Sequence, residues 1–306
     1  MNGSRRKFLQ GACAGLGVTL LDRSFAADDD LASTIKDLRK NLLDMVNEER
    51  EVEKVSPVEM DDLATEVATK HAVDMATNEF ASHWGSDGLK PYHRYSFAGG
   101  THATAENVSA ADNTWSMKVS DLKQDTAYLH LRMYQEKPPY DGHRQTILAR
   151  HHTHVGFGIV VHKLRLRLVE LFVAKHVEVR PIKQLAKPGA QIPFSGKVIR
   201  QDYRLHHVEV CYEPLPTRPE LSWLRQPRSY GLPNESKVLR PKIPPPFIYA
   251  DRVSGAIDMA IDGSFRAPVK LYKETPGIYT VVAWITPGKS DDAFPATAVC
   301  IRGESS

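Results

Sequence analysis

Apolar positions in the first half of the chain follow helical spacing first and strand spacing later. Apolar residues recur every three or four positions over Ile35–Val46 and Leu63–Met75, which predicts two amphipathic helices. A third helix is expected over Leu122–Gln135, because two prolines follow closely and proline cannot continue a helix. Apolar runs at Val155–Val161 and Leu166–Ala174 predict two β-strands joined by a short basic turn. This order of elements indicates an α+β domain in which helices pack on a small sheet.

The second half has a different pattern, with short apolar segments separated by turn residues. Asp262-Gly263, Pro276-Gly277 and Pro287-Gly288 separate several of these segments. Six or seven short strands over roughly 115 residues are typical of a β-sandwich of immunoglobulin-like type. The Pro-rich stretch Pro214–Phe247 fits this plan poorly and is expected to be an extended insertion on the surface. The strand candidates are Lys197–Ile199, Val208–Tyr212, Ala256–Ile261, Val269–Tyr272, Ile278–Ile285 and Ala298–Ile301.

Composition changes sharply near residue 180 and indicates the domain boundary. Of the 20 prolines, 16 lie beyond this point, whereas 11 of the 13 histidines precede it. Residues 181–189 are typical of a linker, because the prolines and the glycine in this stretch interrupt regular structure. We therefore expect an α+β domain over residues 28–180 and a β-sandwich domain over residues 190–306.

The N-terminal residues are typical of an export signal. Ser4–Gln10 contains a twin-arginine motif, Gly11–Leu21 is a short apolar stretch, and Ser24–Ala26 supplies the small residues that a signal peptidase accepts. Residues 1–27 are therefore predicted to be a twin-arginine signal peptide of a bacterial protein that is periplasmic or extracellular. The alternative is a basic amphipathic N-terminus that stays attached. The sequence has no apolar run of about 18 residues, so no conventional transmembrane helix is expected.

Cysteine usage leaves two interpretations open. Removal of the signal peptide would remove Cys13 and leave Cys211 and Cys300, both in strand-like segments of the second half. In an oxidising compartment such a pair can form one disulfide between two strands. The alternative is two separate buried thiols.

The charge distribution argues against a nucleic-acid partner. The formal net charge is +3, and residues 1–27 already carry +3. Residues 28–180 carry −5, from 19 Lys and Arg against 24 Asp and Glu, while residues 181–306 carry +5, from 17 against 12. The processed chain is therefore close to neutral, and its arginines form no basic run. The opposite signs of the two halves are compatible with their packing against each other.

Histidines are the most conspicuous candidates for chemistry in the first half. His151-His152-Thr153-His154 is the densest cluster, but neighbouring residues of an extended segment point to opposite sides. The cluster therefore offers at most one metal-ligand pair, His152 with His154, and is otherwise a solvated loop. No HExxH or CxxC motif occurs, and His71 is expected to pack on a helix face. Ser82 and Ser109 lie in no GxSxG motif of a serine hydrolase.

A series of short segments between residues 35 and 180 carries a family resemblance. The segments are Leu42–Arg50, Asp61–Ala76, Phe80–His83, Ala105–Val108, Gly142–Leu148 and Val155–Ile159. In this order and at these distances they resemble the bacterial form of the CAP superfamily, which comprises cysteine-rich secretory proteins, antigen 5 and pathogenesis-related 1 (SCP-like extracellular domains). The resemblance covers about half of the chain and does not extend to residues 181–306.

The resemblance implies a CAP-type α-β-α sandwich with a central cleft, followed here by the all-β domain. In this cleft His83, Glu106 and His143 are expected to converge, with Glu136 as the candidate for a fourth position. The family binds a divalent ion such as zinc through these histidines in several members. Two imidazoles and water form an open zinc shell, in which Glu106 can orient a ligand. Arg144 replaces the aromatic residue usual in animal and plant members, and their disulfide cysteines are absent from this half.

The sequence thus predicts an exported CAP-domain binding protein. Its cleft is expected to bind a divalent metal and a lipid, peptide or glycan, while the β-sandwich attaches it to a partner such as a cell-envelope component. The alternative is an extracytoplasmic hydrolase of the peptidase type that uses His83, Glu106 and His143 as acid and base. A purely structural envelope protein is a third hypothesis, and Glu106 could instead bind backbone amides of its own loop.

Overall fold

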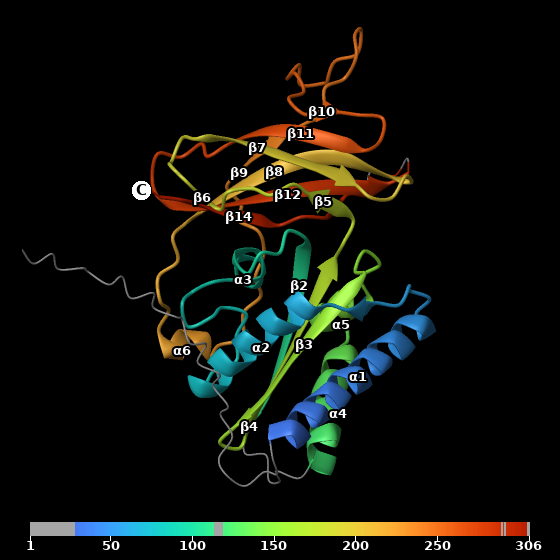
Figure 1. Cartoon of the computed structure of the whole chain (residues 1–306), viewed down its shortest axis with the longest axis vertical. Coiled ribbons are helices and arrows are strands. Elements are labelled where there is room, and N and C mark those ends of the chain that lie inside the picture. The colour runs from blue at the N-terminus through green and yellow to red at the C-terminus, as the bar shows by residue number, and fades with distance from the viewer. Residues whose placement is uncertain (1–27, 113–118, 289, 291, 305–306) are drawn as a thin grey trace, which may run out of the picture.

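The computed structural model describes residues 28–112, 119–288, 290 and 292–304. The predicted signal peptide, residues 1–27, lies outside the described residues. Two bodies meet side by side, with five of the six helices in the described ranges in the first half and two β-sheets in the second (Figure 1). None of the helices in the described ranges is both long and apolar enough to cross a membrane.

A four-stranded sheet forms the centre of the first half. Its strand order is β1 (Glu59–Met60), β3 (His154–His162), β4 (Arg165–Ala174) and β2 (Ala103–Asp112). Strand β2 therefore lies at one edge and pairs antiparallel with β4 along its whole length. The mixed α and β character expected from the sequence is confirmed, but β2 is a strand that the apolar pattern did not predict.

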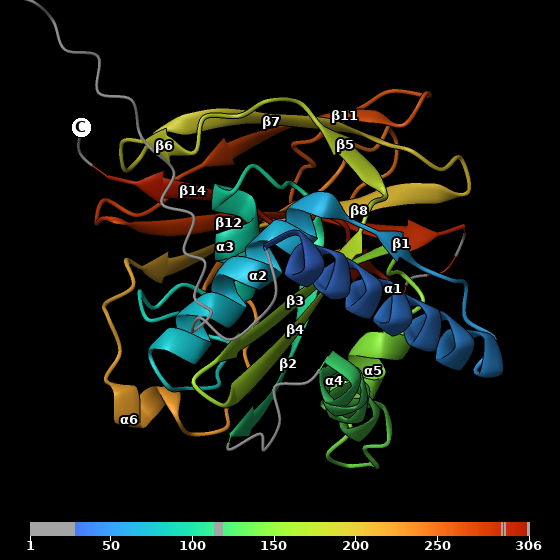
Figure 2. The ribbon, with the colours of Figure 1, turned by 60° about the horizontal axis from the view of Figure 1, so that its bottom comes forward.

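Helices cover both faces of this sheet (Figure 2). One face carries α2 (Asp62–Thr77) and the short α3 (Pro91–Phe97) lies beside it, whereas the other carries α1 (Asp28–Val52), α4 (Val119–Tyr134) and α5 (Gly142–Leu148). Helix α2 can approach β3 closely because Gly156 has no Cβ, which would lie 2.1 Å from the backbone nitrogen of Thr65. The Asp61 carboxylate caps α2 by accepting the Ala64 N–H at 2.5 Å.

One buried arginine, Arg50, joins α1 to the end of α5 and to the loops around the sheet. Arg50, at the end of α1, is fully buried and donates to the carbonyl oxygens of Ser56, Ile147 and His152. These bonds tie α1 to the end of α5 and to the loop before β3. They fix the position of α5, the helix that carries His143.

Two sheets share one hydrophobic core in the second half. Side chains from both sheets, including Phe194, Phe265, Val210 and Tyr279, belong to this core. One sheet has the order β10 (Asp258–Met259), β11 (Ser264–Lys270), β7 (Gln191–Val198) and β5 (Val177–Val179). The other has the order β6 (Leu185–Ala186), β14 (Val299–Gly303), β12 (Gly277–Pro287), β8 (Tyr203–Pro214) and β9 (Ser236–Leu239), with β13 (Phe294–Pro295) also paired to β12. The expected linker at 181–189 thus contains β6, which pairs parallel with β14.

The two cysteines are free and buried. Cys211 on β8 and Cys300 on β14 both face Thr280, which lies on β12 between them. Neighbouring strands are about 4.8 Å apart, so the two Cα atoms are separated by about 10 Å. A disulfide requires Cα atoms within about 7 Å. Of the two interpretations left open by the sequence, the structure contains the separate thiols and not the disulfide.

The Pro-rich stretch Pro214–Phe247 lies on the surface as expected, with Leu224 its only buried residue, and its part between β8 and β9, residues 215–235, forms an insertion. Figure 1 shows it descending from the second half along the first half to α6 (Leu221–Leu224). The Trp223 ring lies 5.1 Å from that of Trp84, and Leu224 is buried in the core beside α2. Only the expectation of a wholly extended stretch was wrong, because α6 turns Leu224 into the core of the first half and Ser236–Leu239 pair with β8 as β9.

A second contact between the halves is ionic. Glu213, at the end of β8, accepts from Lys90 Nζ at 2.7 Å and from Tyr92 Oη at 2.9 Å. His93 Nε2 lies 3.1 Å from the same carboxylate. Lys90, Tyr92 and His93 belong to the first half, so the junction joins the halves at the side of the insertion.

Candidate functional site

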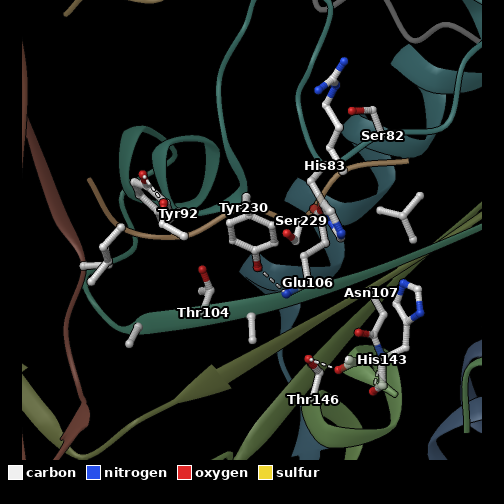
Figure 3. Close-up of a pocket in the computed structure, with 18 of the residues that line it drawn as sticks. Ser82, His83, Tyr92, Thr104, Glu106, Asn107, His143, Thr146, Ser229 and Tyr230 are labelled. Atoms are coloured by element: carbon white, nitrogen blue, oxygen red, sulfur yellow. Dashed lines mark hydrogen bonds and ion pairs between the residues drawn. The ribbon is translucent and has the colours of Figure 1, made fainter. Parts of the chain in front are cut away.

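A cleft of about 880 Å³ lies where β2, α5 and the insertion meet. Six consecutive residues of β2, Ala103–Val108, line it together with His143 and Thr146 of α5. Residues 227–232 of the insertion form the opposite wall (Figure 3). The site is therefore composite, because both halves of the chain contribute to it.

His83 and Glu106 form the first ionic pair of the cleft. His83 Nδ1 donates to Glu106 Oε1 at 3.0 Å, and Arg94 Nη2 donates to Glu106 Oε2 at 2.6 Å. The Glu106 carboxylate is buried, and His71 Nε2 lies 3.9 Å from it. Burial alone would raise the pKa of Glu106, but Arg94, His71 and His83 outweigh it and lower this pKa to about 2. Glu106 is therefore ionised and held on both oxygens.

His143 and Glu136 form the second pair, on the α5 side of the cleft. His143 Nδ1 lies 2.6 Å from Glu136 Oε1, and the His143 N–H donates to Glu136 Oε2 at 3.0 Å. The His143 side chain is 33% exposed, compared with 13% for that of His83. Glu136 follows the end of α4, and the short loop to α5 allows it to reach back to His143.

A buried charged group behind the cleft was missed by the sequence reasoning. Both ring nitrogens of His130 contact a carboxylate: Glu170 Oε1 lies 2.6 Å from Nδ1, and Glu49 Oε2 lies 2.9 Å from Nε2. Burial would lower the pKa of His130, but Glu170 and Glu49 raise it to about 10. Asn107 links this group to the cleft, since its Nδ2 donates to Glu170 Oε2 and to the His143 carbonyl, both at 3.2 Å. The sequence signal that could have revealed this group is the presence of polar residues, His130 and Glu170, within a helix and a strand that were predicted to be buried.

Tyr230 brings the insertion into contact with the first pair. Its hydroxyl accepts the backbone N–H of Glu106 at 2.7 Å, and its ring centroid lies 4.7 Å from that of His83 (Figure 3). Burial raises the pKa of Tyr230, so the phenol keeps its proton. Nothing in the sequence pattern linked this tyrosine to the first half.

The structure thus brings all four predicted residues to one cleft, as two separate pairs. His83 contacts Glu106 and His143 contacts Glu136, and all four line the cleft. Glu106 lies in strand β2 and accepts from two side chains, not from amides of a loop as one alternative held.

The other candidates lie elsewhere or have other partners. The His152 ring is buried against Phe172 with Nδ1 on the Thr146 carbonyl, so it does not pair with His154. His71 packs as expected, with Nε2 2.7 Å from the Ser82 carbonyl oxygen. Ser82 Oγ accepts the Trp84 N–H, and Ser109 does not line the cleft.

Comparison with known proteins decides the identity of the first half. Residues 43–173 match the family model described as the cysteine-rich secretory protein family, CAP. The first half is a CAP domain. The matched range includes both ionic pairs of the cleft, whereas the insertion and the two sheets of the second half lie outside it.

Individual relatives of this CAP domain are distant. The chain is 22% identical over 187 residues to cilia- and flagella-associated protein 184 of Tetrahymena thermophila, covering 61% of this chain and 22% of that protein. This chain therefore spans only about a fifth of that relative's length. An extracellular protein with an SCP domain from Bacillus anthracis is similar at 19% identity and a TM-score of 0.38, covering 49% of this chain and 45% of the other. An outer surface protein of Borrelia burgdorferi is similar at 16% identity and a TM-score of 0.35, covering 49% and 95%.

The cleft of the CAP domain contains two imidazoles that are each backed by a carboxylate. Within residues 28–112 and 119–288 and the described C-terminal residues, no three His, Cys, Asp or Glu side chains are placed to share one ion. His83 and His143 both direct Nδ1 to a carboxylate, which leaves Nε2 of each ring for another partner. This is the orientation that a metal-ligating histidine adopts, with a carboxylate behind the ring. Two imidazoles are fewer than the three protein ligands of a catalytic zinc site, so an ion bound here would need further ligands from water or a bound molecule.

Proposed function

We propose that this protein binds a divalent metal ion and an extracellular ligand in the cleft of its CAP domain. The observation that carries the proposal is that His83 and His143 line one cleft and are each backed by a carboxylate at Nδ1. The ion, zinc by the chemistry of its donors, would be held by the two Nε2 atoms and would supply a Lewis-acid position for a ligand oxygen. Glu106 and Glu136 would fix the orientation of the two rings.

Metal content tests this proposal directly. The purified full chain is loaded with zinc, dialysed and analysed by mass spectrometry, and the same is done with His83→Ala and His143→Ala. We expect about one zinc per chain, lost in both variants, and an unchanged content in His162→Ala, whose histidine lies outside the cleft at the end of β3. Equal zinc in all four proteins would remove the proposed ligands.

A peptidase-type hydrolase is the second candidate, and the geometry supports it less. A general acid must exchange a proton near neutral pH. Glu106 has its pKa lowered to about 2 and both oxygens occupied by Arg94 and His83, so it is poorly suited to this role. A peptide-library digest compared with Glu106→Ala tests it, and activity that disappears in the variant would favour the hydrolase.

We propose an immunoglobulin-like topology for the second half. The strand orders β10-β11-β7-β5 and β14-β12-β8, with β9 added at the edge, support this assignment. They correspond to strands D-E-B-A of one immunoglobulin sheet and G-F-C of the other. Such a domain would attach the CAP domain to a cell-envelope component, and a pull-down of envelope fractions by residues 1–306 with and without the charge reversal Arg266→Glu would test the attachment.

We also propose export by the twin-arginine route to the periplasm or beyond. The support is the sequence Ser4–Gln10 with its paired arginines, followed by a short apolar stretch. Fractionation of cells that express the chain tests this. Arg5→Lys with Arg6→Lys should keep the protein in the cytoplasm, and unchanged export of this double variant would exclude the route.

A further inference from the structure

We propose that the free edge of β2 is the floor of a groove that takes an extended peptide, which adds to the CAP sheet as one more strand. The inference deepens the proposed function, since it rests on the cleft being a binding site and names the class of ligand. Strand addition to a sheet edge is a common mode of peptide recognition, in which backbone hydrogen bonds supply affinity.

One side of β2 has backbone groups without partners. The order β1-β3-β4-β2 leaves β2 paired on one side only, apart from its start, where the Ala103 N–H donates to the Ala296 carbonyl. In an antiparallel strand every second residue directs its N–H and C=O to the same side. The Glu106 N–H points away from β4, because it donates to Tyr230. The backbone groups of Val108, two residues further along the regular part of the strand, therefore point to the same side, and no described residue bonds to them there.

The walls of the cleft lie on both sides of β2. Tyr230 lies on one side of β2, and His143 and Thr146 of α5 lie on the other (Figure 3). The six lining residues Ala103–Val108 correspond to about 20 Å of strand, and because Ala103 is already paired, a peptide of about six residues would cover the rest and extend beyond Val108. Side chains of an added strand would alternate between the two walls.

Unpartnered polar atoms on the floor favour a peptide over a lipid. Asn107 is 1% exposed, and its Oδ1 has no hydrogen-bond partner; the same holds for the buried Oγ1 of Thr104. A buried polar atom without a partner is costly. A peptide brings amide donors into the cleft, whereas an acyl chain brings none.

Charge at the rim selects an acidic peptide. The two carboxylates of the cleft are already engaged, Glu106 by Arg94 and Glu136 by His143. Arg228 of the insertion lies 4.4 Å over the Trp223 ring and has no carboxylate partner among the described residues. It is exposed at the cleft, so an acidic side chain of the peptide can pair with it.

Tyr230 occupies the centre of this edge when no peptide is bound. Its hydroxyl takes the Glu106 N–H, which lies between the paired start of β2 at Ala103 and the open position at Val108. Residues 227–234 of the insertion have no helix or strand, so this segment can move without breaking regular structure. A peptide strand would displace the hydroxyl and replace its one bond with several.

Methylation of the peptide backbone tests strand addition. The probe is a hexapeptide library with glutamate fixed at one central position, selected on the full chain and measured by titration calorimetry. N-methylation at the alternate residues that face β2 should weaken binding at least tenfold, and at the intervening residues less than twofold. Tyr230→Phe should tighten binding about threefold or more, because the loss of one hydrogen bond removes the competing contact.

Two proline variants test the same edge from the side of the protein. Val108→Pro removes an N–H that points into the groove and should weaken binding at least tenfold. Ala110→Pro removes the next N–H on the same side of β2, beyond the lined residues, and should change binding less than twofold. Circular dichroism establishes that both variants fold, and the methylation series decides the matter if Val108→Pro does not.

Several outcomes would overturn the inference. No binding by any library member, a methylation pattern without a two-residue period, or a lipid or glycan that copurifies in the cleft and excludes the peptides would each do so. Zinc content is measured in the same samples. Absent peptide binding with zinc retained by the wild type and lost in His83→Ala rejects this inference alone, while zinc unaffected by that substitution rejects the proposed function.

Discussion

The two buried ionic groups of the CAP domain have opposite arrangements of acidic and basic side chains. In the group beside the cleft, one carboxylate, Glu106, lies among Arg94, His83 and His71. In the group behind it, one imidazole, His130, lies between two carboxylates. The first group keeps Glu106 ionised beside the cleft, and the second keeps His130 protonated in the core. The comparison shows that some histidines of the first half, such as His130 and His71, stabilise the residues around the cleft and do not line it.

Removal of His130 should have the largest effect on stability. His130→Ala leaves Glu170 fully buried and Glu49 nearly so without their common partner, and an uncompensated buried charge costs about 3–5 kcal/mol. Urea unfolding followed by circular dichroism measures the change. His162→Ala, on the same half, should change the free energy of unfolding by less than about 0.5 kcal/mol. A loss below about 1 kcal/mol for His130→Ala would show that the group is not charged as described.

Removal of Arg94 should cost less, about 2–3 kcal/mol, because His83 and His71 remain near Glu106 after the substitution. Arg94→Met keeps the aliphatic part of the side chain and removes the charge. The same urea titrations apply, with Arg144→Met as the control, since Arg144 pairs with the partly exposed Glu53. A control that loses as much stability as Arg94→Met would remove the distinction between buried and exposed pairs.

How much of this could be predicted from the sequence depends on which faces of each element are apolar. The apolar faces of α1, α2 and α4 and the strands β3 and β4 were predicted, because their buried sides contact apolar partners. The bounds agree within three residues except at α1, which extends seven residues before and six beyond the predicted range. Strand β2 was missed because its polar residues face both layers. Glu106 meets Arg94 on one side, and Asn107 meets Glu170 on the other, so no alternation of apolar residues remains.

The candidate site was predicted in part for a related reason. His83, Glu106, His143 and Glu136 carry local motifs, and the structure brings them to one cleft. Tyr230 lies in a stretch without periodic pattern, and only the fold of the second half brings it to the first. Single-chain patterns describe local structure, and they do not encode which distant loop closes a cleft.

The two groups should respond to pH in opposite directions. The pKa of His130 rises to about 10 in the folded chain, from about 6.5 for an unfolded imidazole. The contribution of protonated His130 to the free energy of unfolding is therefore complete below about pH 6.5 and is lost as the pH rises through about 10. Wild-type stability should fall more steeply between pH 7 and pH 10 than that of His130→Gln. Parallel slopes for the two proteins in urea titrations over this range would contradict the prediction.

Glu106 should make the stability of the protein depend on pH in the acid range. Its pKa falls to about 2 in the folded chain, from about 4.3 in an unfolded one. The stabilisation is present above about pH 4.3 and is lost as the pH falls through about 2. Glu106→Gln should be less stable than the wild type at neutral pH, and its stability should decline less between pH 5 and pH 2. Thermal unfolding at unit pH intervals measures both slopes.

The smallest expected effect concerns the hydroxyl by which the second half reaches the first ionic group. Tyr230→Phe leaves the ring beside His83 and removes the acceptor of the Glu106 N–H, at a cost of about 1 kcal/mol. Tyr140→Phe is the matched control, because Tyr140 also lines the cleft but is 86% exposed. Urea unfolding should show no more than about 0.3 kcal/mol for the control. Equal values for the two variants would mean that the backbone group of Glu106 gains nothing from the insertion, and the two halves would then be joined mainly through Glu213 and the Trp84–Trp223 contact.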